Sequence, residues 1–194
     1  VAEEALYLRD LFDFFKMEPH IRAPQQSRPF PRPIQQGFIF ENVGFKYPGS
    51  ERWANRHLSF TLRVGEKLAL VGENGAGKTT LVKLLARLYE ATEGRILLDG
   101  FDLREYDPEE LHREIGVIFQ DFVRYDLTSA ENLAVGRIEA RADAPRIERA
   151  AQRSLANTVI DKLAKGYEQM PGRRFDGGGD LSGGERRKIA LGRA

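Results

Sequence analysis

The sequence has no cysteine among its 194 residues, which excludes disulfide bonds, thiolate metal sites and a cysteine nucleophile. It has no uninterrupted apolar run near the ~18 residues that a membrane-spanning helix needs, and the acidic Glu3 and Glu4 argue against an N-terminal signal peptide. Neither sign of charge prevails, because 30 basic and 29 acidic side chains give a formal net charge of +1. This balance argues against a chain that mainly coats nucleic acid or anionic lipid. The three histidines, at positions 20, 57 and 112, lack the spacing of metal ligands.

Hydrophobic patterning divides the chain into four predicted parts. Residues 1–18 have the period of an amphipathic helix, whose apolar face comprises Tyr7, Leu8, Leu11, Phe12 and Phe15. Residues 19–36 are rich in proline, which is typical of an extended, semi-rigid linker. Residues 37–120 alternate between strand and helix patterns, whereas helix signals dominate residues 121–194. The sequence therefore predicts an α/β body that carries an all-helical part.

Strand signals lie in the first part of the body and in the segment before residue 120. Strand composition or strict alternation is found at residues 38–45, 58–64, 67–71, 95–99 and 115–119. The pair Asp99-Gly100 favours a tight turn after the fourth of these segments.

Two kinds of signal predict helices: apolar residues at helical spacing, and residues that cap the start of a helix. A helical period runs from Lys78 to Tyr89. Further helices are predicted from Asp107 onward, after the Thr128 capping box, after Asp143, and over residues 157–165.

A glycine-rich loop between a predicted strand and a predicted helix matches the pattern G-x-x-x-x-G-K-[ST] over residues 72–79. Glycines let the backbone curl so that successive N–H groups point at phosphate oxygens, and the following helix adds the positive end of its dipole. In such a loop Lys78 supplies a positive charge to the β- and γ-phosphates, and the Thr79 hydroxyl binds magnesium. A chance glycine-rich turn is disfavoured by the flanking strand and helix. A dinucleotide fingerprint is excluded because Thr80 stands where its third glycine would be.

A second helix with exposed N–H groups is predicted at Leu181-Ser182-Gly183-Gly184-Glu185. Ser182 and Glu185 form a capping box, and two glycines occupy the first helical positions. A capped helix start is common when it stands alone. Its place about a hundred residues after the phosphate loop gives it significance.

Together these two motifs resemble the Walker A and signature motifs of the ATP-binding cassette (ABC) ATPases. Two further residues fit the resemblance in order and spacing. Tyr47, in Phe45-Lys46-Tyr47-Pro48, is similar to the aromatic A-loop residue that stacks on adenine, and a flat ring suits that task. Gln120, which ends the predicted strand Ile115–Phe119, is similar to the Q-loop residue that contacts magnesium and the attacking water.

The resemblance implies a P-loop NTPase fold with an N-terminal antiparallel β part, an α/β core and a helical subdomain. It implies that ATP and Mg²⁺ bind here, with Thr79 and Gln120 at the metal and with Lys78 and Gln120 in the catalytic machinery. The nucleotide-binding residues that it implies are Tyr47, Gly72, Glu73, Asn74, Gly75, Ala76, Gly77, Lys78, Thr79 and Thr80. In this family two cassettes meet head to tail, so Ser182, Gly183, Gly184 and Glu185 would act on the nucleotide of the other cassette.

The resemblance covers about residues 38–194 and is greatest to exporter-type half-transporters. Residues 1–36 resemble the end of the last transmembrane helix and its linker to the cassette. The implied partners are a second nucleotide-binding domain and the coupling helices of a transmembrane domain, and the implied location is the cytoplasmic face of a membrane. The alternatives are a soluble ABC ATPase of translation or DNA maintenance, and a non-catalytic nucleotide-binding module. A P-loop kinase is disfavoured by the signature-like motif.

Some family features are absent from these 194 residues or altered in them. No Walker B Asp and Glu and no switch His follow the signature helix. Residues Ile96–Asp99 look like a Walker B strand, but the next residue is Gly100 and not the catalytic Glu. We therefore expect this piece alone to bind ATP weakly, to hydrolyse it negligibly, and to be poorly stable because core strands are missing. Exporters carry an acidic stretch before the signature, and here Asp176 stands in its place but is preceded by Arg173 and Arg174. Glu185 replaces the usual Gln of exporters.

Basic clusters in the helical part could suggest nucleic acid. One of them comprises Arg141, Arg146, Arg149 and Arg153. Acidic residues lie among the basic ones, which favours an ordinary solvated helix face over a nucleic-acid surface.

Overall fold

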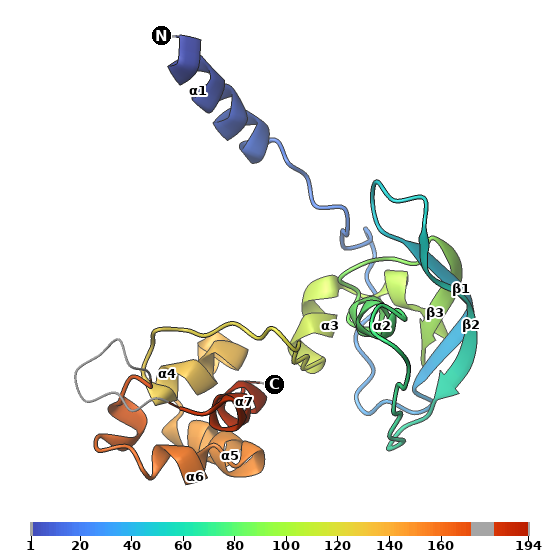
Figure 1. Cartoon of the computed structure of the whole chain (residues 1–194). Coiled ribbons are helices and arrows are strands. Elements are labelled where there is room, and N and C mark those ends of the chain that lie inside the picture. The colour runs from blue at the N-terminus through green and yellow to red at the C-terminus, as the bar shows by residue number, and fades with distance from the viewer. Residues whose placement is uncertain (1, 172–180, 194) are drawn as a thin grey trace. The chain divides into compact units, whose positions relative to one another are not determined.

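The computed structural model describes residues 2–171 and 181–193 (Figure 1). The chain comprises two compact units, residues 1–111 and 112–194. The first contains the sheet and the phosphate loop, and the second contains most of the helices. Arg173, Arg174 and Asp176, which the sequence singles out ahead of the signature motif, lie outside the described residues.

An antiparallel four-stranded sheet forms the first unit, in the order β2-β1-β3-β4. The strands are β1 (Phe38–Lys46), β2 (Trp53–Leu62), β3 (Glu93–Leu98) and β4 (Phe101–Asp102). The central strand β1 pairs with both neighbours, so that Phe38 lies opposite Leu62 on one side and Leu98 on the other. This sheet confirms the antiparallel β part of the predicted fold.

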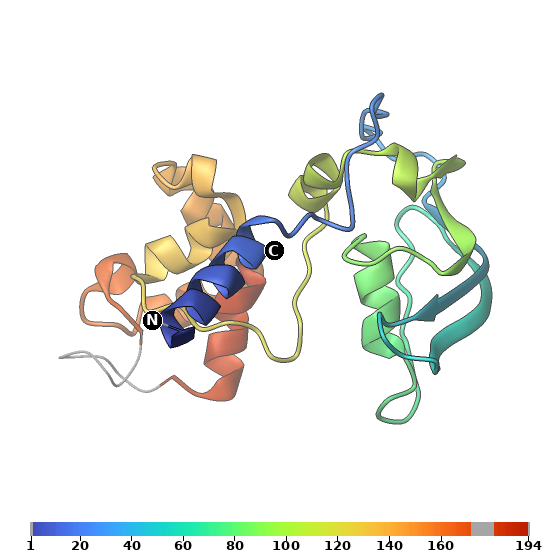
Figure 2. The ribbon, with the colours of Figure 1, turned by 90° about the horizontal axis from the view of Figure 1, so that it is seen from above.

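The core of this unit lies between the sheet and α2 (Lys78–Leu85), which Figures 1 and 2 both place on one face of the sheet. Strand alternation sends Phe40 and Ile96 to the interior, and the helical period does the same for Leu81 and Leu84. Each of these buried side chains contributes about 1.5–3 kcal/mol by leaving water. Packing between α2 and the sheet therefore fixes the start of the helix, where the phosphate loop ends.

Helix α2 is shorter than the predicted segment 78–89. It ends at Leu85, because Arg87 has a left-handed backbone with φ of 48°. The Arg87 side chain is only 3% exposed. Its guanidinium donates to the carbonyl oxygens of Tyr106 at 2.5 Å and Arg22 at 3.4 Å, and it pairs with the Glu90 carboxylate at 2.9 Å. These tertiary contacts turn the chain away from the helix axis, and the helical period of the sequence contains no sign of them.

Two predicted strands are wrong. Residues 67–71 and 115–119 have no assigned strand, and neither segment pairs with another among the described residues. An extended segment becomes a strand only when a neighbour completes its hydrogen bonds. Val71 is accordingly 94% exposed, and Leu68 and Leu70 are also exposed. Among the described residues, the only parallel pairing is a single bridge between Arg28 and Tyr106.

The proline-rich segment, residues 19–36, is hydrogen-bonded to the rest of the first unit at several points. The Arg28 N–H donates to the Glu105 carbonyl at 2.8 Å, and the Phe30 N–H donates to the Glu110 carboxylate at 3.0 Å. The guanidinium of Arg28 also lies 3.4 Å from the centre of the Phe101 ring. The end of this segment is therefore fixed where it enters β1.

The carboxylate of Asp99 fastens the last residues before β1. It accepts hydrogen bonds from the backbone N–H groups of Gln35, Gln36 and Gly37 at 2.8–3.0 Å. Burial alone would raise the pKa of Asp99, but these three donors outweigh it and hold the pKa below its ordinary value. Asp99 and Gly100 both have positive φ, at 50° and 83°, as expected for the predicted tight turn.

Replacing Asp99 by Asn is expected to lower the free energy of unfolding by about 1–2 kcal/mol at neutral pH, because hydrogen bonds to a charged acceptor are lost. The folded pKa of Asp99 lies below its ordinary value of about 3.9, so the ionised carboxylate stabilises the protein fully above that value. This contribution is lost as the pH falls through the folded pKa. Thermal denaturation of the parent and the variant should therefore show a difference in melting temperature that is smaller near pH 3 than at pH 7. An equal difference in melting temperature at both pH values would contradict this role.

The first helix, α1 (Ala2–Phe15), confirms the predicted helix, although it ends three residues earlier. Its aromatic and aliphatic side chains from Tyr7 onward are exposed, including Phe12 and Phe15. Among the described residues, no helix is both long enough and apolar enough to cross a membrane.

Helix α3 (Pro108–Glu114) begins at the predicted Asp107, whose carboxylate accepts from the N–H of Glu109 at 2.8 Å. The second unit then consists of short helices, which Figures 1 and 2 both show gathered together. They are α4 (Ser129–Ala134), α5 (Ala144–Ser154), α6 (Asn157–Ile160) and α7 (Gly183–Leu191), with 3₁₀ turns at Val135–Ala140 and Gly166–Glu168. Their shared core comprises Leu133, Ala151, Ala156, Val159, Ile160 and Ile189.

Helix starts in this unit follow the sequence closely. Thr128 and Ser182 each form the predicted capping box, with Glu131 and Glu185, and the Asp143 side chain caps α5. The helix predicted over residues 157–165 is shorter, because α6 ends at Ile160.

Candidate nucleotide site

The phosphate-loop segment, residues 72–79, runs from an exposed stretch into α2. Gly77 precedes the helix with φ of 82°, a left-handed conformation that side chains rarely adopt. A Cβ atom at this position would lie 2.4 Å from the Asn55 side-chain nitrogen and 2.5 Å from the Ala54 carbonyl oxygen. Glycine is therefore required where the loop passes against β2, and this contact positions the first N–H groups of α2.

The side chain of Lys78 folds back across the loop that precedes it. Its ammonium group donates to the carbonyl oxygens of Gly72 at 2.7 Å and Glu73 at 2.6 Å. These two bonds hold the positive charge over the beginning of the loop, beside the exposed Asn74, Gly75 and Ala76. A compact cation at a helix N-terminus is a suitable environment for phosphate oxygens.

The two threonines after Lys78 lie in different surroundings. Thr79 is exposed, so its hydroxyl is available to a ligand at the loop. Thr80 is buried, and its hydroxyl lies 3.1 Å from the phenol oxygen of Tyr47. The structure thus brings the predicted aromatic residue to the first turn of the phosphate-loop helix, although 33 positions separate them in sequence.

Tyr47 belongs to a cluster of aromatic rings that sequence reasoning did not find. The rings of Phe45 and Tyr89 lie 4.9 and 5.3 Å from its centre, both edge to face. The ammonium of Lys83 lies 5.5 Å from the centre of the Tyr47 ring and 5.7 Å from that of Tyr89. Attraction between this ammonium and the two rings helps to hold Tyr47 and Tyr89 in their orientations. Both Lys83 and Tyr89 lie within the helical period predicted from Lys78 to Tyr89, but nothing in that period indicates that they meet Tyr47.

In the second unit, Ser182 and the two glycines form an exposed helix start. The Ser182 hydroxyl accepts from the Glu185 N–H at 3.3 Å, and the Glu185 carboxylate accepts from the Ser182 N–H at 2.9 Å. These hydrogen bonds from Ser182 hold the pKa of Glu185 below its ordinary value. The space that a Cβ would fill at Gly183 and Gly184 is open. A ligand or partner can therefore approach the first N–H groups of α7 closely.

Gln120 lies in an exposed turn of the second unit. The first unit brings together Tyr47, the phosphate loop, Lys78 and the two threonines. Gln120 and the residues around Ser182 belong to the other unit. The roles of the residues in both units toward a nucleotide stay predictions.

Among the described residues, no group of three or more His, Asp or Glu side chains is placed to hold a metal ion. The residues predicted at a magnesium ion, Thr79 and Gln120, offer a hydroxyl and an amide oxygen. Oxygen ligands of this kind, with phosphate and water oxygens, suit Mg²⁺, which rarely binds in an all-protein cage. The exposed Thr79 hydroxyl beside Lys78 therefore fits a metal ion that arrives with a nucleotide.

Comparison with known proteins gives a family match and several relatives. The family model described as ABC transporter matches residues 55–194. Subtilin transport ATP-binding protein SpaT of Bacillus subtilis is 34% identical over 97% of this chain and 30% of its own length. The mitochondrial iron-sulfur clusters transporter atm1 of Aspergillus fumigatus is 36% identical over 100% of this chain and 26% of its own length.

A solved structure of a bacterial Atm1-family ABC exporter with ATP bound is also similar. It superposes with a TM-score of 0.83 at 30% sequence identity, over 99% of this chain and 32% of that one. The chain thus spans about a third or less of the relatives that it matches.

Proposed function

Because this chain belongs to the ABC transporter family, we propose that it is the nucleotide-binding domain of an exporter, which binds ATP with Mg²⁺. In the intact protein, hydrolysis of ATP would drive transport across a membrane. The observation that carries this proposal is the arrangement of Lys78, held over the loop by two carbonyl groups, beside the Tyr47–Thr80 hydrogen bond. One place in the first unit thus offers both a phosphate site and an aromatic ring for a base.

The residues of the loop would each contact a different portion of the nucleotide. The N–H groups from Gly72 to Thr80 and the ammonium of Lys78 would bind phosphate oxygens. The Tyr47 ring would stack on the adenine, because a flat aromatic ring offers a face to a base. The hydroxyl of Thr79 would bind Mg²⁺, which neutralises charge on the β- and γ-phosphates.

Gln120 would bind the metal and orient water near the γ-phosphate. The residues of the signature-like motif would bind the nucleotide of a second nucleotide-binding domain arranged head to tail. Ser182, Gly183, Gly184 and Glu185 of one domain would then face the γ-phosphate that the other domain holds. The exposed, capped start of α7 supports this proposal, because its N–H groups can donate hydrogen bonds to an anion from outside the chain.

The proposed location is the cytoplasmic face of a membrane, where transmembrane coupling helices would contact the domain. Residues 1–36 would form the end of a transmembrane helix and its linker. The exposed aromatic side chains of α1 support this assignment, since they would pack against neighbouring helices. Arg87 and Asp99 would transmit force from the linker, because both bond residues of that segment.

The change Ser182→Arg in the full-length protein is expected to abolish ATP-driven association of the two domains and to leave ATP binding at the phosphate loop intact. The bulky cation would fill the space beside Gly183 that a γ-phosphate of the other domain needs. Cross-linking of the domains with and without ATP, together with equilibrium binding of labelled ATP, measures the two effects separately.

Thr128→Ala is the matched control, because Thr128 caps a helix of the same unit with the same capping box. Loss of either cap costs about 1 kcal/mol of stability. The control variant should still associate upon addition of ATP. Normal association of the Ser182→Arg protein would refute the proposed role of this helix start.

A further inference from the structure

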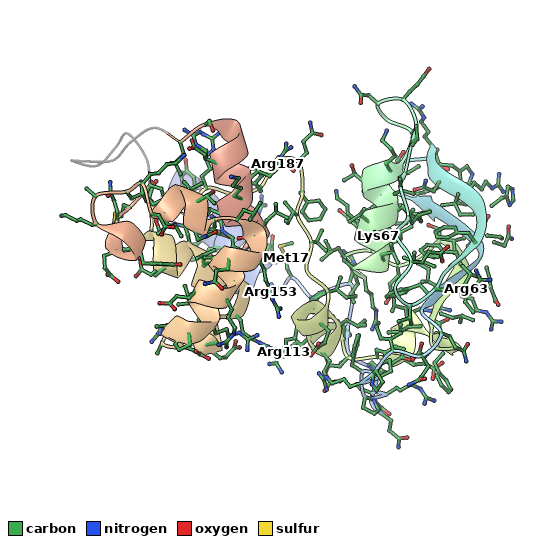
Figure 3. The ribbon with its side chains drawn as sticks, turned by 90° about the horizontal axis from the view of Figure 1, so that it is seen from below. Met17, Arg63, Lys67, Arg113, Arg153 and Arg187 are labelled. Atoms are coloured by element: carbon green, nitrogen blue, oxygen red, sulfur yellow. The ribbon has the colours of Figure 1, made fainter. Side chains whose placement is uncertain are left out.

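The second unit contains a cavity of about 670 Å³ that the proposed function does not use. Its wall is formed by α5, by the end of α4 with the 3₁₀ turn after it, and by the end of α7. The lining includes six arginines and no acidic residue. They are Arg113, Arg137, Arg146, Arg149, Arg153 and Arg193, and two of them, Arg113 and Arg153, are labelled in Figure 3.

The arginines of α5 lie on one face of the helix. Arg146, Arg149 and Arg153 are spaced by three and four residues, which places them in one row. The acidic residue among them, Glu148, is not part of the lining. The sequence predicts a solvated helix face for this cluster, and Arg146, Arg149 and Arg153 are exposed, in agreement with that prediction. The same exposed face lines the cavity.

Most of these guanidinium groups have no partner in the described part of the chain. Arg137, Arg146, Arg149 and Arg153 form no ion pair or side-chain hydrogen bond with any described residue. Arg193 is fixed in place, because it donates to the carbonyl oxygens of Asn132 at 3.0 Å and Val123 at 2.6 Å. The Arg193 guanidinium is therefore held in one position, whereas those of Arg137, Arg146, Arg149 and Arg153 carry positive charge that no described side chain neutralises.

The inner surface of the cavity is partly apolar. Leu133 and Ala134 are buried, and Ile147 packs against the helical core. Apolar walls lower the local dielectric constant, which strengthens the attraction between a guanidinium and an anion. A volume of this size lies within the range of about 300–1,000 Å³ that is typical of small-molecule sites.

We propose that this cavity binds a small soluble anion that carries several phosphate groups. Arginine is suited to this ligand, because its planar fork donates two parallel hydrogen bonds to one phosphate. Several guanidinium groups around one concave space match several phosphates on one molecule. A lipid headgroup within a bilayer fits less well, because the arginines line a hollow and not a flat face. An acidic protein segment is the competing ligand.

The test uses the full-length protein with Lys78→Ala, so that the phosphate loop does not dominate binding, and sodium tripolyphosphate as the probe. Isothermal titration is expected to detect one site per chain. Arg149→Gln combined with Arg153→Gln should weaken that binding about tenfold or more, since two charge-assisted contacts are lost. Replacing the same pair by Lys, which keeps the charge and removes the fork, should give an intermediate affinity.

Arg124→Gln combined with Arg141→Gln is the matched control, because both residues are exposed, lie outside the lining and carry the same total charge. This variant should bind tripolyphosphate within about twofold of the parent, and the melting temperatures of all variants establish that they are folded. Equal affinity in the Arg149–Arg153 variants and the parent would overturn the proposal. Binding of a poly-glutamate peptide without binding of tripolyphosphate would also overturn it, in favour of an acidic protein partner.

Discussion

Lys78→Ala is expected to weaken ATP binding by at least about 30-fold, which corresponds to about 2 kcal/mol. The ammonium group is the one side-chain cation held directly over the loop in the described part of the chain, at 2.7 and 2.6 Å from the carbonyl oxygens of Gly72 and Glu73. Without it, the loop would lose the positive charge that attracts the phosphate oxygens. Equilibrium dialysis with labelled ATP and Mg²⁺ on the full-length protein measures the effect.

Lys67→Ala provides the control, because Lys67 is an exposed lysine on the segment that leads into the same loop (Figure 3). Its removal lowers the charge by the same amount without touching the loop carbonyls, so ATP affinity should change by less than about twofold. If both variants bound ATP as tightly as the parent, the phosphate site would lie elsewhere.

Arg87→Ala is expected to lower the free energy of unfolding by about 2–4 kcal/mol, the largest stability effect that we predict. The guanidinium is almost completely buried, so its loss leaves the Tyr106 carbonyl without its donor and the Glu90 carboxylate without its cation. The change also removes the hydrogen bond to the Arg22 carbonyl and so loosens the proline-rich segment. Chemical denaturation of the purified protein measures the free energy.

Arg95→Ala is the comparison that isolates burial from charge. Arg95 also pairs with a glutamate, Glu41 at 2.6 Å, but its side chain is 57% exposed. An exposed pair contributes about 0–1 kcal/mol, so this variant should lose far less stability than Arg87→Ala. Similar losses in the two variants would mean that burial of Arg87 does not determine its contribution.

Helix starts could be predicted from the sequence because their chemistry is local. Thr128, Asp143 and Ser182 each satisfy N–H groups within three residues of themselves, and all three cap helices as expected. The tight turn at Asp99 and Gly100 is equally local. The family could likewise be predicted, because the order and spacing of its motifs are properties of the sequence itself.

Features that depend on distant partners could not be predicted. Helix α2 ends early because Arg87 bonds Tyr106, which lies 19 residues further along the chain. The segments 67–71 and 115–119 have strand composition, yet composition cannot say whether a neighbouring strand is present. The arginines of α5 are exposed, as the sequence predicts, but helical period alone does not show that this exposed face lines a cavity.

The candidate site was predicted in part. The loop, Lys78 and the two threonines follow from one continuous pattern, and Tyr47 follows from its spacing to that pattern. The ring of Tyr89 and the ammonium of Lys83 meet Tyr47 only in the folded chain, and no spacing rule describes that meeting. The contact of Asn55 with Gly77 arises in the same way, from the position of β2.

The hydrogen bond between Tyr47 and Thr80 has a consequence for the thermodynamics of ligand capture. An aromatic side chain that rotates freely must surrender rotamer entropy when it meets a base, and this loss subtracts from affinity. Here the Tyr47 phenol is already hydrogen-bonded to the buried Thr80. Much of the rotamer entropy of the ring is therefore lost on folding, before any base binds. If Tyr47 stacks on a purine as proposed, the association should resemble the fitting of two rigid surfaces, with little reordering of the protein.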